Sequence, residues 1–288
     1  MDNDMNSDVL PTKRSSAKED RDYLLDYKSV DLSALGGTEI LGVSLNNVTR
    51  DEAVAVILNW LETGGGPRLV SFLDPVKLMR LRPRAKYGAL ATESDLALAD
   101  GAGLEWAASL LHKEIKERIP MMALLMDVVR LAEKMELTIY LLGMSMENVE
   151  QAFLNIQRSF PGVRIIGRQG GITGPERERL VKESLRKSSP AIVFLGMGFP
   201  RQEQWYKDNK AIFNKAVVFG VDESLDILSG NEKIAPDWMQ LKGLAWLWRV
   251  LTNPLAAGDF FRTLKFLILV RFHAFRTRKK APGIQAET

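Results

Sequence analysis

The amino-acid sequence predicts an α/β protein, with a parallel sheet flanked by helices and a C-terminal helical appendage. From Glu39 onward, short β-rich runs alternate with stretches of helical periodicity, as in successive β-α-β units. Strand-like runs such as Ala191–Leu195 are apolar throughout, which is typical of a parallel sheet buried on both faces. Beyond residue 230 only helical patterns continue.

In the first half of the α/β region, capping residues mark where the helices begin. Thr49 as N-cap and Glu52 three residues later form a capping box. Pro75 follows Asp74 at a first helical position, where its missing N–H costs little. The elements expected here are strands at 39–45, 68–73 and 96–99, and helices at 49–62 and from 75.

The second half of the region repeats this alternation with longer helices. Crossover connections that contain a whole helix join parallel strands, and such connections are right-handed. The elements expected here are an amphipathic helix at 121–135, strands at 137–143, 163–167, 191–196 and 215–220, and helices from 146, 175 and 200.

The chain divides into four expected segments. The N-terminal run has early acidic residues and lacks the apolar stretch of a signal peptide, so we expect it to be disordered and the protein to be cytoplasmic. The longest apolar run, "FLILV" at 266–270, is far shorter than the ~20 residues that span a bilayer. The segments are a disordered lead-in at 1–37, an α/β domain at 38–230, a helical appendage at 231–280 and a disordered tail at 281–288.

Composition excludes several kinds of chemistry. The 288 residues contain no cysteine, which rules out disulfides, thiolate metal sites and cysteine nucleophiles. Only two histidines are present, which disfavours a histidine metal centre or a Ser-His-Asp triad. The D-x-D patterns of the chain lie in the lead-in, so no metal site is expected in the folded domain.

Ligands of an open parallel sheet bind beyond the carboxyl ends of its strands, so the loops that follow strands are the candidate binding loops. Loops at 73–75, 99–103, 142–144 and 195–203 carry polar residues and glycines there. Asp74, Gly101 and Gly143 are the substrate-binding candidates of the first three loops.

The fourth loop, "LGMGFPRQE", resembles a dinucleotide-binding loop only in part. Arg201 stands where the third glycine of G-x-G-x-x-G is needed. Gly196 and Gly198 still permit close approach of a phosphate to the start of a helix, and Gln202 and Glu203 can hold a base or sugar hydroxyl. The alternative, given equal weight, is a tight turn with Gln202 and Glu203 exposed.

Two charged residues are candidates for catalysis. Asp100 follows a strand in "ADGAG", where a carboxylate can act as general base on a sugar hydroxyl. Taken alone, an Asp that caps the next helix or forms an Asp-Gly turn is the more common case. Arg118 in "KERIP" can neutralise a diphosphate, although a solvated arginine in a charged run is again more common.

Taken in order, the motifs resemble the WecG/TagA/CpsF family of bacterial glycosyltransferases. The matching stretches run from about residue 39 to 255. They include "ILGVSLNNVTRDEAV", "LALADGAGL", "KERI", "LGMGFPRQEQW" and "IAPDWMQLKGLAWLWRVLTNP". The pairing of "LGMGFPRQE" with "APDW" about 30 residues later is the most specific part.

The resemblance implies a Rossmann-like domain, C-terminal membrane-associating helices and no metal or other cofactor. Members transfer a sugar from a UDP-sugar, often N-acetylmannosamine or its uronic acid, to a polyprenyl-diphosphate-linked acceptor, with inversion. Asp100 matches the position of the family's base and Arg118 its motif arginine. Gln202 and Glu203 match its donor-binding pair.

Several residues depart from the family pattern. The usual Thr-x-Asn after the first parallel strand is Phe72-Leu73-Asp74, and a glycine pair is replaced by Asp222-Glu223. An arginine is replaced by Ile234 and a glutamate by Ala245. Added acids and a lost arginine weaken attraction for a diphosphate. The resemblance therefore leaves open a changed donor or acceptor, or reduced activity.

The C-terminal segment interleaves aromatic and aliphatic residues with basic ones. Residues 262–280 contain seven Lys or Arg and no Asp or Glu. This composition favours an interfacial helix on an anionic membrane over a helix packed on the domain, and disfavours nucleic acid. The expected membrane-contact residues are Arg262, Lys265, Arg271 and Arg276.

We therefore predict a metal-independent inverting glycosyltransferase of cell-surface polysaccharide synthesis, cytoplasmic and peripheral on the inner face of the membrane. Its partners are a UDP-sugar, a polyprenyl-diphosphate-linked acceptor and an anionic membrane surface, and a homo-oligomer stays open. The alternative is a catalytically impaired family member that acts as a binding or scaffold protein. An NAD-dependent oxidoreductase is disfavoured by the missing third glycine.

Overall fold

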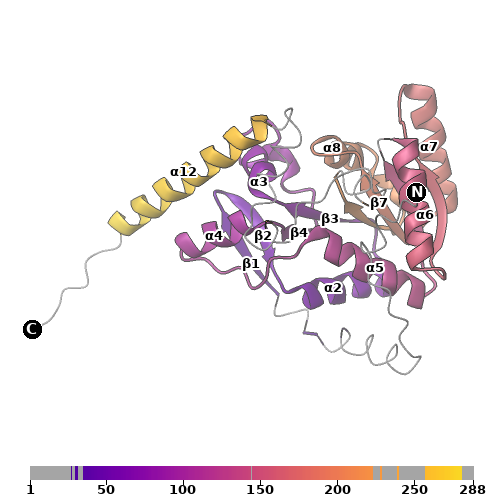
Figure 1. Ribbon diagram of the computed structural model, residues 1–288, viewed down its shortest axis with the longest axis horizontal. Coiled ribbons are helices and arrows are strands. Elements are labelled where there is room, and N and C mark those ends of the chain that lie inside the picture. The colour runs from indigo at the N-terminus through magenta and orange to yellow at the C-terminus, as the bar shows by residue number, and fades with distance from the viewer. Residues whose placement is uncertain are drawn as a thin grey trace, which may run out of the picture. The chain divides into compact units, whose positions relative to one another are not determined.

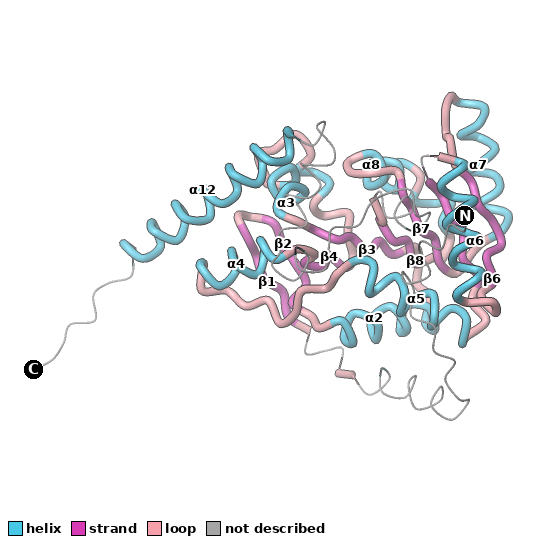
Figure 2. Tube along the Cα trace, viewed as in Figure 1, coloured by secondary structure: helices cyan, strands magenta, loops and turns pink. Residues whose placement is uncertain are grey.

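The computed structural model describes residues 27, 30, 31, 35–143, 145–222, 228, 239 and 257–280 (Figures 1 and 2). Most of the predicted lead-in, the tail at 281–288 and the "APDW" motif lie outside these residues. So do three of the departures from the family pattern, at Glu223, Ile234 and Ala245.

The main sheet has six strands in the order β4-β3-β8-β7-β5-β6. The pairs β5–β6, β5–β7 and β7–β8 are parallel, and β7 and β8 are buried along their whole length. The α/β class with a parallel sheet is thus confirmed. The strands are β3 (Arg68–Leu73), β4 (Leu96–Ala99), β5 (Thr138–Gly143), β6 (Arg164–Gln169), β7 (Ile192–Gly196) and β8 (Val217–Gly220).

Helices alternate with these strands, as predicted, and a long helix ends the described chain. The α-helices of the described residues are α2 (Arg50–Thr63), α3 (Pro75–Leu81), α4 (Ala102–Leu110), α5 (Met121–Lys134), α6 (Met146–Ser159), α7 (Pro175–Ser188), α8 (Arg201–Asp208) and α12 (Ala257–Lys280). Short 3-10 helices lie at η2 (Gly88–Leu90) and η3 (Lys210–Phe213).

The prediction of a single strand at 39–45 was wrong. The segment is an antiparallel hairpin of β1 (Gly36–Ile40) and β2 (Val43–Asn47). Leu41 and Gly42 form its two-residue turn with φ of 51° and 85°. Such a turn needs positive φ at both positions, which Asn-Gly usually supplies. Leu41 carries no such signal, and its burial fits an apolar residue at this turn.

The chain divides into two compact units, and the division falls within β3. The first unit includes Asp51–Val70 and Met121–Lys233, and the second includes Leu35–Arg50, Ser71–Pro120 and Ile234–Thr288. In the first unit a buried cluster of strand and helix residues, including Tyr140, Leu195 and Tyr206, forms the core.

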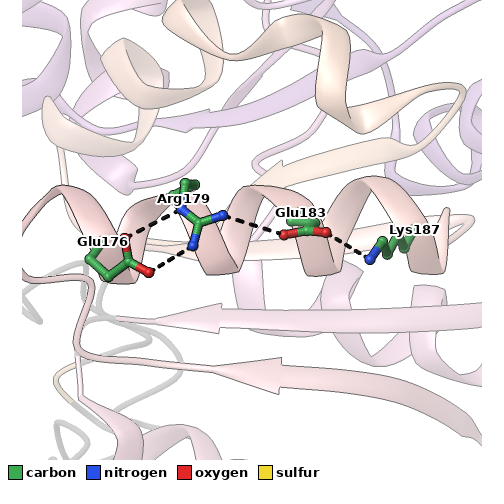
Figure 3. A network of polar contacts seen from close by, with 4 residues as sticks. All are labelled: Glu176, Arg179, Glu183 and Lys187. Atoms are coloured by element: carbon green, nitrogen blue, oxygen red, sulfur yellow. Dashed lines mark hydrogen bonds and ion pairs between the residues drawn. The ribbon is translucent and has the colours of Figure 1, made fainter.

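Helix α7 carries a ladder of ion pairs along one face (Figure 3). Arg179 lies 2.7 Å from Glu176 and 3.9 Å from Glu183, and Glu183 lies 2.7 Å from Lys187. The Lys187 hydrogen bond lowers the pKa of Glu183. Solvent screens these exposed pairs, so α7 is held mainly by its buried face.

Replacing Gly167 in β6 by alanine should destabilise the protein. Gly167 pairs with Tyr140 of β5, and a Cβ at Gly167 would overlap the buried Tyr140 ring. Because Tyr140 is fixed by its hydroxyl contact with Ser184 at 3.1 Å, the ring cannot simply move aside. We expect Gly167→Ala to lower the free energy of unfolding by about 1–3 kcal/mol in urea titrations.

The matched control is Gly36→Ala at the start of β1. A Cβ there would have nothing within 4 Å. Equal unfolding free energies for the two variants would contradict the clash at Gly167.

Candidate active site

In the second unit, two loops that follow strands touch each other. The Asp100 N–H donates to the Leu73 carbonyl at 2.8 Å, which continues the β3–β4 pairing past the end of β4. A Cβ on Gly101 would lie 3.8 Å from the Cβ of Asp74, and one on Gly103 would lie only 2.6 Å from Pro75. The sequence thus brings Asp74 and Asp100 to the same edge of the sheet.

The backbone fixes different roles for these two acids. Asp74 is the N-cap of α3, and its Oδ1 accepts the Lys77 N–H at 2.7 Å, as the Asp-Pro signal predicted. The N-cap of α4 is Gly101 with φ of 123°, so Asp100 does not occupy the capping position. Asp100 is half-buried just before that helix.

Arg118 is carried to the same region by the backbone that flanks it. The Ile119 N–H donates to the Ala99 carbonyl at 2.9 Å, next to Asp100. On the other side, the Lys116 N–H donates to Asn47 Oδ1 at 2.7 Å. Arg118 is half-buried and makes no hydrogen bond or ion pair with any residue that the structure describes. Because Arg118 is anchored and partly buried, the interpretation as an anion-binding residue fits better than that of a solvated arginine in a charged run.

In the first unit, the loops after β5 and β7 start side by side. Gly143 and Gly196 are direct partners in the parallel register, so both predicted binding glycines end adjacent strands. Gly198 has φ of 71° with open space where its Cβ would be. Its carbonyl accepts the Gln202 N–H at 3.1 Å, at the start of α8. The loop therefore leaves room beside the first turn of α8.

Gln202 and Glu203 are buried, so the alternative of an exposed pair was wrong. Their side chains are 1% and 2% exposed. Gln202 Nε2 donates to Glu203 Oε1 at 3.1 Å and to Asp222 Oδ1 at 2.9 Å. In return, Gln202 Oε1 accepts the Asp222 N–H at 3.0 Å. Both N–H groups of the Gln202 amide are thus used within the protein.

This network explains two other features of the strand ends. A Cβ on Gly220 would lie 2.7 Å from Gln202 Nε2, so glycine makes room for the amide at the end of β8. Asp222 has φ of 47°, a left-handed conformation that Asp tolerates better than most residues. Asp222 holds Gln202 in this structure.

Helix α8 is also fixed by its neighbours. Arg201 Nη2 donates to the Ile172 carbonyl at 2.8 Å, and Trp205 Nε1 donates to Glu178 Oε1 at 3.1 Å. The pKa of Glu178 is lowered, first by the Lys182 hydrogen bond and against a smaller effect of burial. The start of α8 is therefore held on both sides.

The other departure in the described residues, Phe72, lies in the core. It is 2% exposed within β3. The structure therefore uses this aromatic ring for packing, since a buried strand residue adds apolar area to the core.

Helix α12 has one buried face and one exposed apolar face. It contacts α3 and α4 and buries Thr263, Phe266, Val270 and Ala274. The predicted membrane-contact residues Arg262, Lys265, Arg271 and Arg276 are all exposed. Phe261, Leu264, Ile268, Phe272 and Phe275 form an exposed apolar stripe at helical spacing.

Two of these basic residues have partners on the helix itself. Arg262 lies 2.6 Å from Asp259, and the Arg276 guanidinium lies 4.9 Å from the centre of the Phe272 ring. Within the described residues, no helix is long and apolar enough to cross a membrane, and no three acidic or histidine side chains group to hold a metal ion.

Sequence reasoning missed Asn46, Asn47 and Glu117. Asn46 Oδ1 accepts the Ala97 N–H of β4 at 2.8 Å. Glu117 Oε2 accepts the N–H of Arg50, the first residue of α2, at 2.8 Å. The adjacent asparagines at the end of an apolar strand were the available signal, because Asn side chains readily bond to backbone groups.

Comparison with known proteins yields one family and a set of named relatives. The model of the glycosyl transferase WecG/TagA/CpsF family matches residues 38–280. A Bacillus spizizenii protein named N-acetylglucosaminyldiphosphoundecaprenol N-acetyl-beta-D-mannosaminyltransferase is 30% identical over 188 residues, which cover 65% of this chain and 72% of that protein. A Staphylococcus aureus protein of the same name is 28% identical over 216 residues, which cover 75% of this chain and 84% of that protein.

Gln202→Glu should destabilise the protein in a pH-dependent way. The change places a third carboxylate beside Glu203 and Asp222, and removes both amide donors. We expect a loss of about 2–4 kcal/mol at pH 7 in urea titrations. Burial and like charge raise the folded-state pKa of the new acid, so the loss should shrink as the pH falls from 7 to 5.

The matched control is Gln204→Glu on the same helix. Gln204 is exposed and its amide bonds only the exposed Asp208 at 2.9 Å. We expect less than about 0.5 kcal/mol from this change. A pH-independent loss, or equal losses in both variants, would contradict the buried network.

Proposed function

Because the chain belongs to the WecG/TagA/CpsF family of glycosyltransferases, we propose a specific reaction for it. It moves a sugar of the N-acetylhexosamine type from a UDP-sugar to a lipid-diphosphate-linked acceptor in cell-surface polysaccharide synthesis. The transfer is inverting and metal-independent. The relatives' names specify an N-acetylglucosaminyl-diphosphoundecaprenol acceptor and an N-acetyl-β-D-mannosaminyl group that is transferred, which supports this substrate class.

The observation that carries the proposal is the contact between the loops after β3 and β4. Asp100 bonds Leu73 through its backbone, the next residue Gly101 lies beside Asp74, and the anchored segment at Arg118 joins the same strand end through Ala99. A carboxylate and an arginine at one strand edge are the groups that acceptor activation and diphosphate stabilisation need.

In this mechanism Asp100 accepts the proton of an acceptor hydroxyl as that oxygen attacks the anomeric carbon. The bond between that carbon and the UDP oxygen breaks as the new glycosidic bond forms, so the configuration inverts. UDP leaves with the bonding electrons, and Arg118 offsets the negative charge that develops on its diphosphate. Asp74 and Gly101 shape the substrate-facing edge beside Asp100.

The first unit carries the other substrate-binding candidates. Gly143, Gly196 and Gly198 keep side chains away from the strand ends, and the N-terminus of α8 favours phosphate. Gln202 and Glu203 serve the donor by fixing the loops after β7 and β8, in addition to any contact of their own. The buried hydrogen bonds of the pair support this role.

We assign α12 to the inner face of the cell membrane. Its exposed aromatic and aliphatic stripe would enter the interfacial region, while the exposed basic residues would meet anionic headgroups at about 1 kcal/mol each. Peripheral attachment of this kind would bring the protein to a lipid-linked acceptor.

A second candidate, a binding or scaffold protein, is favoured by one observation. Asp222 uses one of the two amide hydrogens of Gln202, whereas the family's glycine has no side chain to do so. Calorimetric titration with UDP separates the two: the enzyme should bind UDP, and a scaffold with a closed donor site should not.

Asp100→Asn should abolish most turnover while leaving the fold intact. The amide keeps the shape of the side chain and cannot accept a proton. We expect UDP release from a UDP-N-acetylhexosamine in the presence of acceptor to fall by about 10²–10⁴-fold. Glu105→Gln, an exposed carboxylate on α4, is the control and should keep wild-type turnover. Near-wild-type activity of Asp100→Asn would remove Asp100 as the base.

Ile268→Asp and Phe272→Asp should weaken membrane binding without loss of stability. Their side chains are 60% and 52% exposed, so neither supports the packing of α12. Loss of one inserted apolar side chain should reduce binding to phosphatidylglycerol-containing vesicles about tenfold or more. Leu154→Asp, which is 45% exposed on α6, is the control. Equal vesicle binding by all four proteins in sedimentation assays would overturn the assignment of α12.

A further inference from the structure

The stretch that carries Arg118 is anchored at each of its other positions. Asn47 Oδ1 accepts the Lys116 N–H at 2.7 Å, Glu117 Oε2 accepts the Arg50 N–H at 2.8 Å, and the Ile119 N–H bonds the Ala99 carbonyl at 2.9 Å. Among residues 116–119, Arg118 alone makes no polar contact with the described part of the chain. The pattern holds the backbone of Arg118 and leaves its guanidinium for a ligand.

We propose that Asn47 is a positioning residue for Arg118. Its side-chain carbonyl fixes the Lys116 backbone and thereby sets where the Arg118 guanidinium meets an anion. The inference rests on the proposed function, in which that anion is the diphosphate of the nucleotide-sugar. Asn47 itself touches neither substrate nor reacting atoms.

The burial of Asn47 shows that this contact is specific. Asn47 is only 9% exposed at the end of β2. Lys116 itself is exposed, so without Asn47 its backbone N–H would turn to solvent and the segment would lose this attachment to β2. The orientation of the amide is also determined, because only its oxygen can accept from an N–H.

The neighbouring residue provides an internal comparison. Asn46 Oδ1 holds the Ala97 N–H at 2.8 Å, within β4 and three residues before Asp100. Two adjacent asparagines of one strand thus hold the two elements that present Asp100 and Arg118. Loss of the Asn47 side chain should therefore lower the affinity for the anion, whereas loss of the Asn46 side chain should disturb β4, the strand that precedes Asp100.

The experiment measures UDP affinity by calorimetry, and kcat and KM for the UDP-sugar, in single and double variants of the full chain. We expect Arg118→Lys to weaken UDP binding about tenfold, because lysine lacks the fixed fork of arginine. Asn47→Ala should weaken it about three- to tenfold, with a larger change in KM than in kcat. The acid limb of the pH–rate profile should stay in place, because that limb reports the base.

Coupling between the residues decides the proposal. The Asn47→Ala/Arg118→Lys double variant should bind UDP about as weakly as Arg118→Lys alone. In the Asn46→Ala/Arg118→Lys double variant, by contrast, the fold-changes of the two single variants in UDP affinity should multiply. Asn47→Asp retains the acceptor for the Lys116 N–H and should restore most of the affinity. Hydrogen exchange should rise at Lys116 in Asn47→Ala and remain unchanged there in Asn46→Ala.

Each failure has a distinct meaning. Absence of glycosyl transfer with normal UDP binding would overturn the proposed reaction, and the binding cycle would still decide the role of Asn47. Multiplicative effects of Asn47→Ala and Arg118→Lys, or no effect of Arg118→Lys, would overturn the positioning role. If Asn47→Ala does not fold, the Asn47→Asp and Asn47→Ser variants replace it. An Asn47→Ser variant that binds UDP with wild-type affinity while its Lys116 amide exchanges freely would contradict the proposal.

Discussion

The candidate catalytic groups depend on two backbone hydrogen bonds at the carboxyl ends of β3 and β4. The Asp100 N–H bonds the Leu73 carbonyl and the Ile119 N–H bonds the Ala99 carbonyl. Because these bonds are made by the backbone, they fix the path of the chain at Asp100 and Arg118 independently of either side chain. The close approach of Gly103 to Pro75 adds a steric constraint, since no larger residue fits between α3 and α4 there. The chemistry assigned to this edge therefore follows from the topology of the sheet.

A second constraint acts at the other set of strand ends, where a buried polar network replaces apolar packing. Gln202 uses its amide to join Glu203 and Asp222, and a glycine at 220 leaves space for it. Such a network stabilises one arrangement strongly when all its members are satisfied, and costs free energy when one is removed. Asp222 is part of this network, since its carboxylate accepts from the Gln202 amide and its N–H donates to the same amide.

Much of the fold was predictable from the sequence because its signals are local. The Asp74-Pro75 helix start and the alternation of buried strands with helices need only neighbouring residues to be recognised, and the structure confirms both. The Leu41-Gly42 turn was missed because its conformation is unusual for leucine. Burial of Gln202 and Glu203 was missed for another reason. It depends on Asp222 and Gly220, which are about 20 residues away in sequence. The roles of Asn46 and Asn47 likewise depend on partners 51 and 69 residues away.

The central claim is that this chain transfers a sugar with inversion and without a metal. The most direct measurement is product analysis by NMR after incubation of the full chain with UDP-α-N-acetylmannosamine and a polyprenyl-diphosphate-linked N-acetylglucosamine, in the presence of EDTA. The account predicts a β-linked disaccharide and one UDP released for each linkage formed. An α-linked product, transfer that stops when EDTA is added, or UDP binding without any product would contradict it.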